Sequence, residues 1–246
     1  MRKKSRADVS LVERGLFASR EQAQRAIMAG QVRTGDRVVA KSSEMLSADS
    51  ELTVEAPAKY VGRGGLKLEG ALDHFRIDPD GLTCLDIGAS TGGFTDCLLQ
   101  RGAAKVYAID VGHGQLAWKI RSDPRVVARE HLNARQLTRE DIPEPIDLCV
   151  IDVSFISLTL ILPAAFELLT PSGMLLALIK PQFELAASDV GRGGIVKEPE
   201  LHEKAQQKID AFVRERGHEV CGIAPAPITG TDGNQEFFIC ARKRSA

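Results

Sequence analysis

Four charged residues stand at the ends of apolar segments that are far apart in the sequence: Lys67, Asp152, Lys180 and Glu236. Lys180 follows six apolar residues, so we expect its amine to be partly desolvated, which favours the neutral form that accepts a proton. Lys67 could act as its positive neighbour or orient an acceptor group with Asp152, and Glu236 could hold either lysine. The set predicts removal of a proton from a weak nucleophile. Ordinary salt bridges at strand ends are the alternative for any one of the four alone.

A glycine-rich loop follows the apolar segment 83–87. It reads Asp86-Ile-Gly-Ala-Ser-Thr-Gly-Gly-Phe94, so its spacing departs from the G-x-G-x-x-G fingerprint of dinucleotide sites. Glycines let the backbone approach a ligand closely, and a nearby carboxylate suits a cationic sulfonium with an amino-acid tail. We therefore expect S-adenosylmethionine as cofactor. The predicted contacts in this loop are Asp86, Gly88, Ser90, Gly92, Gly93 and Phe94.

Three later residues are predicted to complete the cofactor site. Asp110 ends the next apolar segment, where a carboxylate can accept the two hydroxyls of a ribose, although a simple strand-end cap is the alternative. Asn133 follows the third segment and could read an adenine edge or merely form a turn. Asp152 is expected to contact the cofactor as well as to take part in catalysis.

The cofactor loop and the charged set together predict methyl transfer to a hydroxyl. A ribose hydroxyl is a poor nucleophile, whereas a sulfonium methyl is already a good electrophile, so positioning and proton removal are the tasks left to the protein. A base N-methyltransferase would be expected to carry an Asn/Asp-Pro-Pro-Tyr type of loop, where this chain has Asp152-Val-Ser-Phe155. The non-enzymatic alternative is an RNA-binding or cytolytic protein with a vestigial methyltransferase fold.

The elements that must position these residues alternate from residue 81 onward between apolar strands and amphipathic helices, the pattern of a parallel sheet covered by helices. Ligands in such sheets bind beyond the carboxyl ends of the strands. Strands are predicted at 83–87, 105–110, 126–129, 147–152, 174–180, 219–226 and 236–242, with helices at 93–101, 158–169 and 201–216.

Charge is distributed unevenly along the 246 residues. Residues 1–41 contain ten Lys or Arg and four Asp or Glu, whereas the remainder contains 22 and 29. A basic leader on an acidic body predicts a polyanionic partner that is reached through the N-terminal part. A solvated tail that only aids solubility is the alternative.

The basic segment divides into two helical pieces and a small hairpin. Asp8 is expected to cap the first helix and Gly15 to end it, while Ser19 caps the second with Gln22 three residues on, as in a capping box. Short strands flank the turn at 34–36, and another follows at 52–55. A proline and three glycines then predict a linker at 56–65, between domains at 1–58 and 59–246.

Residues 1–56 resemble an S4 RNA-binding domain, a small α+β module. The motif elements are Arg-Ala-Asp, Leu-Val, Gly-Leu, Ser-Arg and a closing Gly-x-Val, in that order. The resemblance implies that cationic side chains contact an RNA backbone, with an affinity that falls as salt rises. An arginine-rich hairpin that packs on the second domain is the alternative. The expected RNA-binding residues are Arg6, Arg14, Arg20, Arg25, Arg33 and, in the linker, Arg63.

Residues 59–246 resemble the FtsJ-like RNA 2'-O-methyltransferases, and the whole chain resembles the TlyA family, which fuses an S4 domain to that fold. The matching motifs include Tyr60-Val-Gly-Arg-Gly-Gly-Leu-Lys-Leu, the loop at 85–96, Ile151-Asp-Val-Ser-Phe and Leu178-Ile-Lys-Pro-Gln-Phe-Glu. The resemblance implies an α/β, Rossmann-like class I S-adenosylmethionine-dependent methyltransferase domain. It assigns the family's catalytic tetrad to Lys67, Asp152, Lys180 and Glu236.

The same resemblance implies ribosomal RNA as substrate and a cytidine 2'-hydroxyl as acceptor. It leaves open whether RNA of one or both ribosomal subunits is modified. Members of the family are often labelled haemolysins, but no amphipathic, aromatic-rich membrane helix is evident, so direct membrane lysis is not expected.

Cysteine usage and hydropathy predict a cytoplasmic address. The five cysteines form no C-x-x-C pair and are expected to be reduced, buried packing residues, and we expect no metal site. The longest apolar run, 174–179, is far too short to span a membrane, and the basic start has no apolar signal core. The expected partners are ribosomal RNA and ribosomal subunits, and no protein partner can be inferred.

Overall fold

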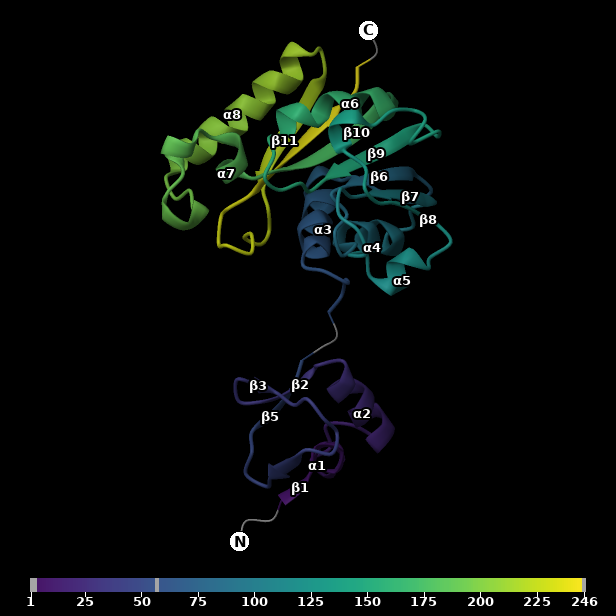
Figure 1. Ribbon diagram of the computed structural model, residues 1–246, viewed down its shortest axis with the longest axis vertical. Helices are drawn as coiled ribbons and strands as arrows, with labels where there is room; N and C mark the ends of the chain where they lie inside the picture. Colours follow the sequence, from purple (N-terminus) through teal and green to yellow (C-terminus); the bar gives the residue numbers. More distant parts are fainter. Residues whose placement is uncertain (1–3, 56–57, 245–246) are drawn as a thin grey trace. The chain divides into compact units, whose positions relative to one another are not determined.

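The computed structural model describes residues 4–55 and 58–244 and divides into two compact units, Met1–Ala58 and Lys59–Ala246 (Figure 1). Part of the predicted linker, residues 56–57, lies outside the described residues. Its last two residues, Gly64 and Gly65, are already the first turn of a helix, so the connection is shorter than the sequence predicted. Each unit has a hydrophobic core of its own.

The smaller unit packs two helices against short strands, as predicted. Helices α1 (Ala7–Glu13) and α2 (Arg20–Met28) share a core with strand β2. This strand is the middle one of a three-stranded antiparallel sheet of order β3-β2-β5. Its strands are β2 (Val32–Thr34), β3 (Arg37–Val38) and β5 (Leu52–Val54). A second pair, β1 (Lys4–Arg6) with β4 (Met45–Ser47), was not predicted, because three-residue strands of mixed polarity carry no periodic signal.

The predicted helix ends are confirmed except at the start of α1. Gly15, with a φ of 70°, directly follows the C-cap residue Arg14 and so ends α1 as predicted. The hydroxyl of Ser19 accepts from the backbone N–H of Gln22 at 3.3 Å, so the predicted cap of α2 is confirmed. The prediction that Asp8 caps α1 is wrong in position: the N-cap residue is Arg6, and Asp8 lies inside the first turn.

Asp8 instead joins the two helices. Its fully buried carboxylate pairs with Arg6 and Arg20, each at 3.0 Å, and accepts from Gln24 Nε2 at 2.7 Å. Hydrogen bonding to the Arg6 guanidinium holds the pKa of Asp8 well below its usual range. Two arginines that the sequence assigned to RNA therefore also hold the unit together.

The larger unit is built on a seven-stranded sheet of order β11-β12-β10-β9-β6-β7-β8. Neighbouring strands from β10 to β8 pair in parallel, whereas β12 runs antiparallel to both of its neighbours. The prediction of a parallel sheet is therefore wrong for the last strand, β12. The chain returns from β11 to β12 through the short segment 226–236. The strands are β6 (Thr83–Ile87), β7 (Lys105–Ile109), β8 (Val126–Arg129), β9 (Ile146–Ile151), β10 (Leu169–Ile179), β11 (Glu219–Pro225) and β12 (Phe237–Arg242).

Predicted strand limits agree with these to within one residue, except for β10. That strand begins five residues before the predicted start at Met174, and its register with β9 shifts between Leu169 and Met174. Ser172 in this stretch has a positive φ of 68°. The irregular stretch Thr170-Pro-Ser-Gly173 reads as a turn in the sequence, which explains the difference.

Helices cover both faces of the sheet (Figure 1). One core cluster joins a sheet face to α3 (Gly64–Phe75), α4 (Gly93–Gln100) and α5 (Trp118–Arg121). The other joins the opposite face to α6 (Leu162–Leu168) and α8 (Pro199–Glu215). The one-turn helix α7 (Pro181–Glu184) follows β10, with Lys180 between them as its N-cap residue. This is the predicted α/β architecture of Rossmann-like type.

The cysteines and the hydropathy of the helices add two observations. All five cysteines are free thiols, but Cys221 on β11 is exposed, so the prediction that every cysteine is buried is wrong there. Among the helices within 4–55 and 58–244, none combines the length and the apolar character needed to cross a bilayer.

The buried carboxylate of Asp8 generates a prediction about acid stability. Because its pKa is lowered on folding, it stabilises the smaller unit above about pH 4, and this contribution is lost as the pH falls below that value. Replacement of Asp8 by Asn should reduce the local unfolding free energy at pH 7 by roughly 2 kcal/mol, since both arginines stay partly hydrated.

Hydrogen exchange of the α1 and α2 amides measures this loss. Asp36→Asn, at an exposed turn of the same unit, is the matched control. Equal protection in both variants at pH 7 would contradict the role of Asp8.

Candidate active site

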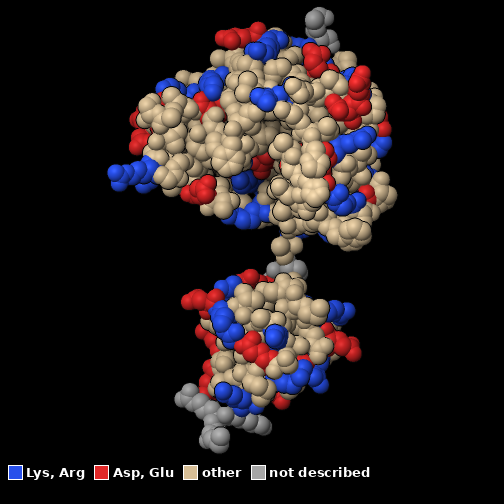
Figure 2. All heavy atoms as spheres, in the orientation of Figure 1, with Lys and Arg blue, Asp and Glu red and all other residues tan. Residues whose placement is uncertain are grey.

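The strands β6, β9 and β10 end at one edge of the sheet, and a cavity of about 290 Å³ lies there. Figure 2 shows the larger unit hollowed at one place, with basic and acidic side chains in its depth. The lining comes from the start of α3, the glycine loop after β6, the segments that follow β9 and β10, and the segment 229–236 before β12.

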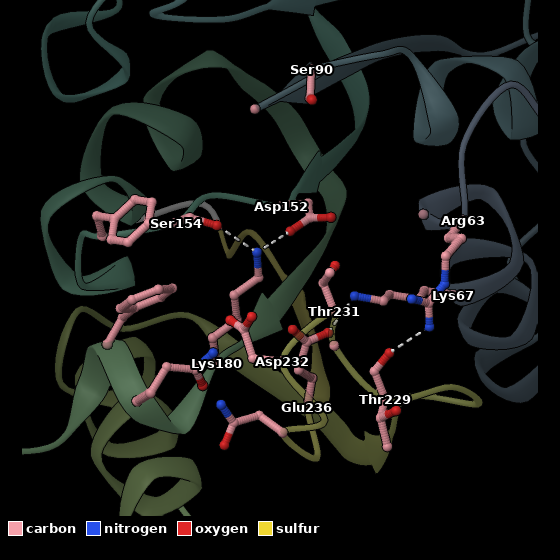
Figure 3. Close-up of a pocket in the computed structure, with 17 residues that line it drawn as sticks. Arg63, Lys67, Ser90, Asp152, Ser154, Lys180, Thr229, Thr231, Asp232 and Glu236 are labelled. Carbon is pink, nitrogen blue, oxygen red and sulfur yellow. Dashed lines mark hydrogen bonds and ion pairs between the residues drawn. The ribbon is translucent and has the colours of Figure 1, made fainter. Parts of the chain in front are cut away.

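The four residues predicted to be catalytic all line this cavity (Figure 3). Asp152 directly follows β9 and Lys180 directly follows β10, so both stand at the carboxyl ends of neighbouring parallel strands. Glu236 directly precedes β12, and only the antiparallel direction of that strand brings its start to the same edge. Lys67 reaches the cavity from the first turn of α3.

These four residues form two ion pairs. Lys67 Nζ lies 2.5 Å from Glu236 Oε2, and both side chains are at most one-tenth exposed. Lys180 Nζ lies 2.6 Å from Asp152 Oδ1 and donates a hydrogen bond to Ser154 Oγ at 2.9 Å. Glu236 therefore holds Lys67, one of the two partners that the sequence left open. The partner of Lys180 is the carboxylate of Asp152, whereas Lys67, for which the sequence left open a role as the positive neighbour of Lys180, pairs with Glu236.

Gly88 allows the glycine loop to lie against the end of β9, where Asp152 follows the strand. Its φ is 86°, and a Cβ at this position would stand 2.2 Å from the carbonyl oxygen of Asp152. The backbone N–H of Asp152 in turn donates to Ile87 O at 2.9 Å. Any side chain at residue 88 would therefore displace the backbone that carries Asp152.

Asp110 braces the loops at the ends of β6 and β7. Its Oδ2 accepts from the backbone N–H of Ser90 and its Oδ1 from that of Gly112, both at 2.7 Å. Gly88 and Ser90 line the cavity, while Gly92 and Gly93 are buried at the start of α4. The contact of Asp110 with a ribose stays a prediction.

Asp86 and Phe94 lie beneath the loop and not on the cavity wall. Asp86 is fully buried; Thr95 Oγ1 donates to its Oδ2 at 2.6 Å, and desolvation raises its pKa to about 7. Phe94 packs on Phe238 in the core, with ring centroids 6.0 Å apart. Both side chains thus support the loop from below, and neither opens onto the cavity as we had expected of cofactor contacts.

Asn133 occupies an exposed turn after β8. Its Oδ1 accepts from the backbone N–H of Arg135 at 3.1 Å and so caps the short 3-10 helix η1 (Ala134–Gln136). This is the turn-forming alternative that the sequence left open. Recognition of an adenine edge by Asn133 stays a prediction.

The arginines predicted to bind RNA have different surroundings. Arg6 and Arg20 pair with Asp8; Arg14 donates to the carbonyl groups of Ser47, Ala48 and Ser50; Arg33 donates to Asp36 O and pairs with Glu55 at 3.6 Å. Arg25 is exposed and has no side-chain partner among the described residues. Arg63 belongs to the cavity of the larger unit, where it donates to Thr229 O at 3.2 Å (Figure 3).

Sequence reasoning missed two aromatic residues of the cavity. Phe155 is 90% exposed at a positive φ of 64°, and its ring centroid lies 5.1 Å from that of Phe183. Each phenylalanine comes three residues after a residue predicted to be catalytic, in Asp152-Val-Ser-Phe155 and Lys180-Pro-Gln-Phe183. A large apolar residue at that place in a surface loop was a usable signal.

The sheet order with one reversed strand, the glycine loop after the first strand and the charged cavity at the strand ends define a class I methyltransferase fold. Residues 60–243 match the FtsJ-like methyltransferase family, and residues 5–52 match the S4 domain family. The chain belongs to the FtsJ-like methyltransferases and, within them, to the TlyA family, as its motifs predicted.

Three similar proteins illustrate this membership. The Mycobacterium tuberculosis protein named 16S/23S rRNA (cytidine-2'-O)-methyltransferase TlyA is 44% identical over 247 residues, covering 100% of this chain and 92% of that protein. The Bacillus subtilis protein named "Putative rRNA methyltransferase YqxC" is 48% identical, with coverages of 96% and 85%. A solved structure described as "Putative hemolysin from Streptococcus thermophilus" is 44% identical, with a TM-score of 0.76 and coverages of 100% and 90%.

The raised pKa of Asp86 predicts how the larger unit responds to pH. An acid whose pKa is raised on folding keeps its proton in the folded state after the unfolded state has lost it. The unfolding free energy should therefore fall by roughly 4 kcal/mol at most as the pH rises from about 4 to about 7.

Urea unfolding at several pH values measures this slope. Asp86→Asn should flatten it, whereas Glu140→Gln, at an exposed carboxylate of the same unit, should leave it unchanged. An Asp86→Asn protein with the wild-type slope would show that this group titrates normally.

Proposed function

We propose that this protein transfers a methyl group from S-adenosylmethionine to the 2'-hydroxyl of a cytidine in ribosomal RNA. The observation that carries the proposal is the pair of lysine–carboxylate contacts in one cavity beside the glycine loop. The names of the similar proteins from Mycobacterium tuberculosis and Bacillus subtilis support an rRNA substrate, and the former supports the cytidine 2'-oxygen.

The glycine loop suits the cofactor because two of its residues, Gly88 and Ser90, line the cavity. Without a side chain, Gly88 lies against the carbonyl oxygen of Asp152, and Asp110 is held at the end of β7 by two backbone amides. When bound, S-adenosylmethionine supplies an electrophilic methyl group on a positively charged sulfur. Gly88, Ser90, Gly92, Gly93 and Asp110 would hold it, with Asn133 as a further candidate.

Proton removal falls to Lys180. Its amine, when neutral, accepts the proton of the 2'-hydroxyl, and the ammonium group that forms is stabilised by Asp152 at 2.6 Å. Ser154 fixes the direction of the amine through the hydrogen bond at 2.9 Å. Lys67 orients the acceptor oxygen from the other side of the cavity, and Glu236 holds Lys67 in place.

The rim of the cavity suits a nucleotide that has left its helix. A ribose oxygen cannot reach such a recess while its base stays stacked, and unstacked bases commonly rest on aromatic side chains. Phe155 and Phe183 offer such a surface next to Lys180 and Ser154. The guanidinium of Arg63 lines the same cavity, on the side of Lys67 and Thr229 (Figure 3), and could pair with a phosphate.

The smaller unit would bind the RNA backbone. Arg25 supports this role most directly, because the described residues leave its charge without a partner. Arg6 and Arg20 keep side chains that are 42% and 55% exposed despite their contact with Asp8, so they can still donate to phosphates. Arg14 and Arg33 complete the proposed set. Ribosomal subunits are the proposed partners and the cytoplasm the proposed location, in keeping with five free thiols.

Methyl transfer from labelled S-adenosylmethionine tests the proposed reaction directly. Intact ribosomal subunits and naked ribosomal RNA serve as substrates. Lys180→Ala should lower the single-turnover rate by about 10²- to 10⁴-fold, the usual contribution of a general base. Calorimetry should show an unchanged affinity for the cofactor.

Lys204→Ala, which removes an exposed lysine of α8, is the matched control and should keep the wild-type rate. Equal labelling by wild type and Lys180→Ala would remove Lys180 from the mechanism. Absence of label on every ribosomal substrate would favour the alternative, a protein that binds RNA without modifying it.

Division of labour between the units gives a separate prediction. Deletion of residues 1–56 should weaken binding to ribosomal RNA at physiological salt, because the main cationic surface is lost. Affinity for S-adenosylmethionine should stay within about threefold, since a factor of that size corresponds to well under 1 kcal/mol. Calorimetry with the cofactor and filter binding with the RNA measure the two effects. Loss of cofactor binding in the shortened protein would contradict this assignment.

A further inference from the structure

A buried carboxylate, that of Glu184, lies next to the catalytic residues but has no part in the proposed chemistry. Glu184 ends the short helix α7, and its side chain is 1% exposed. Its Oε1 accepts from the backbone N–H of Leu158 at 2.7 Å, and its Oε2 accepts from Ser157 Oγ at 2.6 Å. Both donors belong to the segment that follows β9.

Glu184 and Lys180 join two chain segments to each other, one at each end. The segment 180–184 starts with Lys180, which donates to Ser154 Oγ at 2.9 Å, and ends with Glu184, which binds Ser157 and Leu158. The two five-residue segments 180–184 and 154–158 are thus tied to each other at both ends. Ser154 cannot move relative to Lys180 without straining the contacts of Glu184.

Lys208 of α8 binds Glu184 and Ser157 from the solvent side. Its Nζ donates to Glu184 Oε2 at 2.9 Å, to the carbonyl oxygen of Glu184 at 2.6 Å and to Ser157 Oγ at 3.3 Å. The lysine is 41% exposed, so it neutralises the buried charge while it stays hydrated. A buried carboxylate with a complete set of donors holds its surroundings in one arrangement, and removal of its charge weakens every contact at once.

The two joined segments, 154–158 and 180–184, also carry the two phenylalanines of the cavity. Phe155 lies in the first segment and Phe183 in the second, and their ring centroids are 5.1 Å apart. Phe155 has a positive φ of 64°, a conformation that costs energy for a bulky residue and persists only where the surroundings impose it. The ties at Ser157 and Leu158, two and three residues further on, supply such a constraint.

We infer that Glu184 is a positioning residue for the methyl transfer: through Ser157 and Leu158 it fixes Ser154 and Asp152 relative to the amine of Lys180. The inference rests on the proposed function. A misplacement of about 1 Å at a reacting group can lower a rate by as much as 10²-fold, so loss of this constraint should be visible in the chemical step.

The test is a comparison of single-turnover rates and binding constants in the full-length protein. Glu184→Gln keeps the size of the side chain but removes its charge, and it should lower the rate at saturating substrates by about 10- to 100-fold. The dissociation constants for S-adenosylmethionine and for RNA should change by less than about threefold. Glu203→Gln, at an exposed carboxylate of α8, is the matched control and should have the wild-type rate.

A double-substitution cycle separates positioning from a general structural effect. If Glu184 acts through Lys180, then Glu184→Gln should cost almost nothing in a Lys180→Ala background, because the group that it positions is gone. An equal loss in both backgrounds would show that Glu184 acts independently of Lys180 and would overturn the inference.

A milder variant covers the case in which Glu184→Gln fails to fold. Ser157→Ala removes one of the two hydrogen bonds that this segment donates to Glu184 and should lower the rate by about 3- to 10-fold with unchanged binding, because the other bond, from Leu158, remains. A wild-type rate in Ser157→Ala and in any folded Glu184→Gln protein would contradict the role of Glu184 while leaving the methyltransferase proposal intact. Absence of transfer by the wild type would overturn both.

Discussion

The ion pair between Lys180 and Asp152 is the contact on which the rest of the arrangement depends. Its two charges come from the ends of neighbouring parallel strands, β9 and β10, so they meet only because those strands lie side by side and stop at the same edge. Moving two charges out of water costs free energy that their attraction does not always return. A pair kept in such a place is better explained by the chemistry of the cavity than by stability. The glycine at residue 88 serves the same arrangement by letting the cofactor loop touch the backbone of Asp152.

The second pair, Lys67 with Glu236, adds two elements that a simple parallel sheet would not supply. Lys67 comes from the start of a helix, and Glu236 precedes a strand that runs against its neighbours. The reversed strand is therefore a structural requirement of the site, because it carries a carboxylate to the edge where the other strands end. Behind both pairs, Glu184 and Asp110 hold the loops that the strands leave at this edge.

The strands and the residues at their ends could be predicted from the sequence, because the strands are apolar runs with sharp limits. Asp152 and Lys180 each follow such a run, and parallel strands end at a common edge, so their proximity is predictable. Partners could not be predicted in the same way: nothing in the sequence says that Glu236 binds Lys67, that Asp8 binds two arginines, or that Asp86 and Phe94 face the core. Those facts depend on side-chain directions at positions distant in the sequence. Asn133 shows a related limit, because the sequence alone does not distinguish an asparagine that forms a turn from one that binds a ligand.

The residues at the sheet edge shared by β9, β10 and β12 are proposed to catalyse methylation of a ribose oxygen. The identity of the modified nucleoside tests this proposal most directly. Ribosomal RNA treated with the protein and S-adenosylmethionine can be digested to nucleosides and separated by mass spectrometry. The account predicts that 2'-O-methylcytidine increases and that no base-methylated nucleoside does. A methyl group on a base, with unmodified ribose, would contradict it.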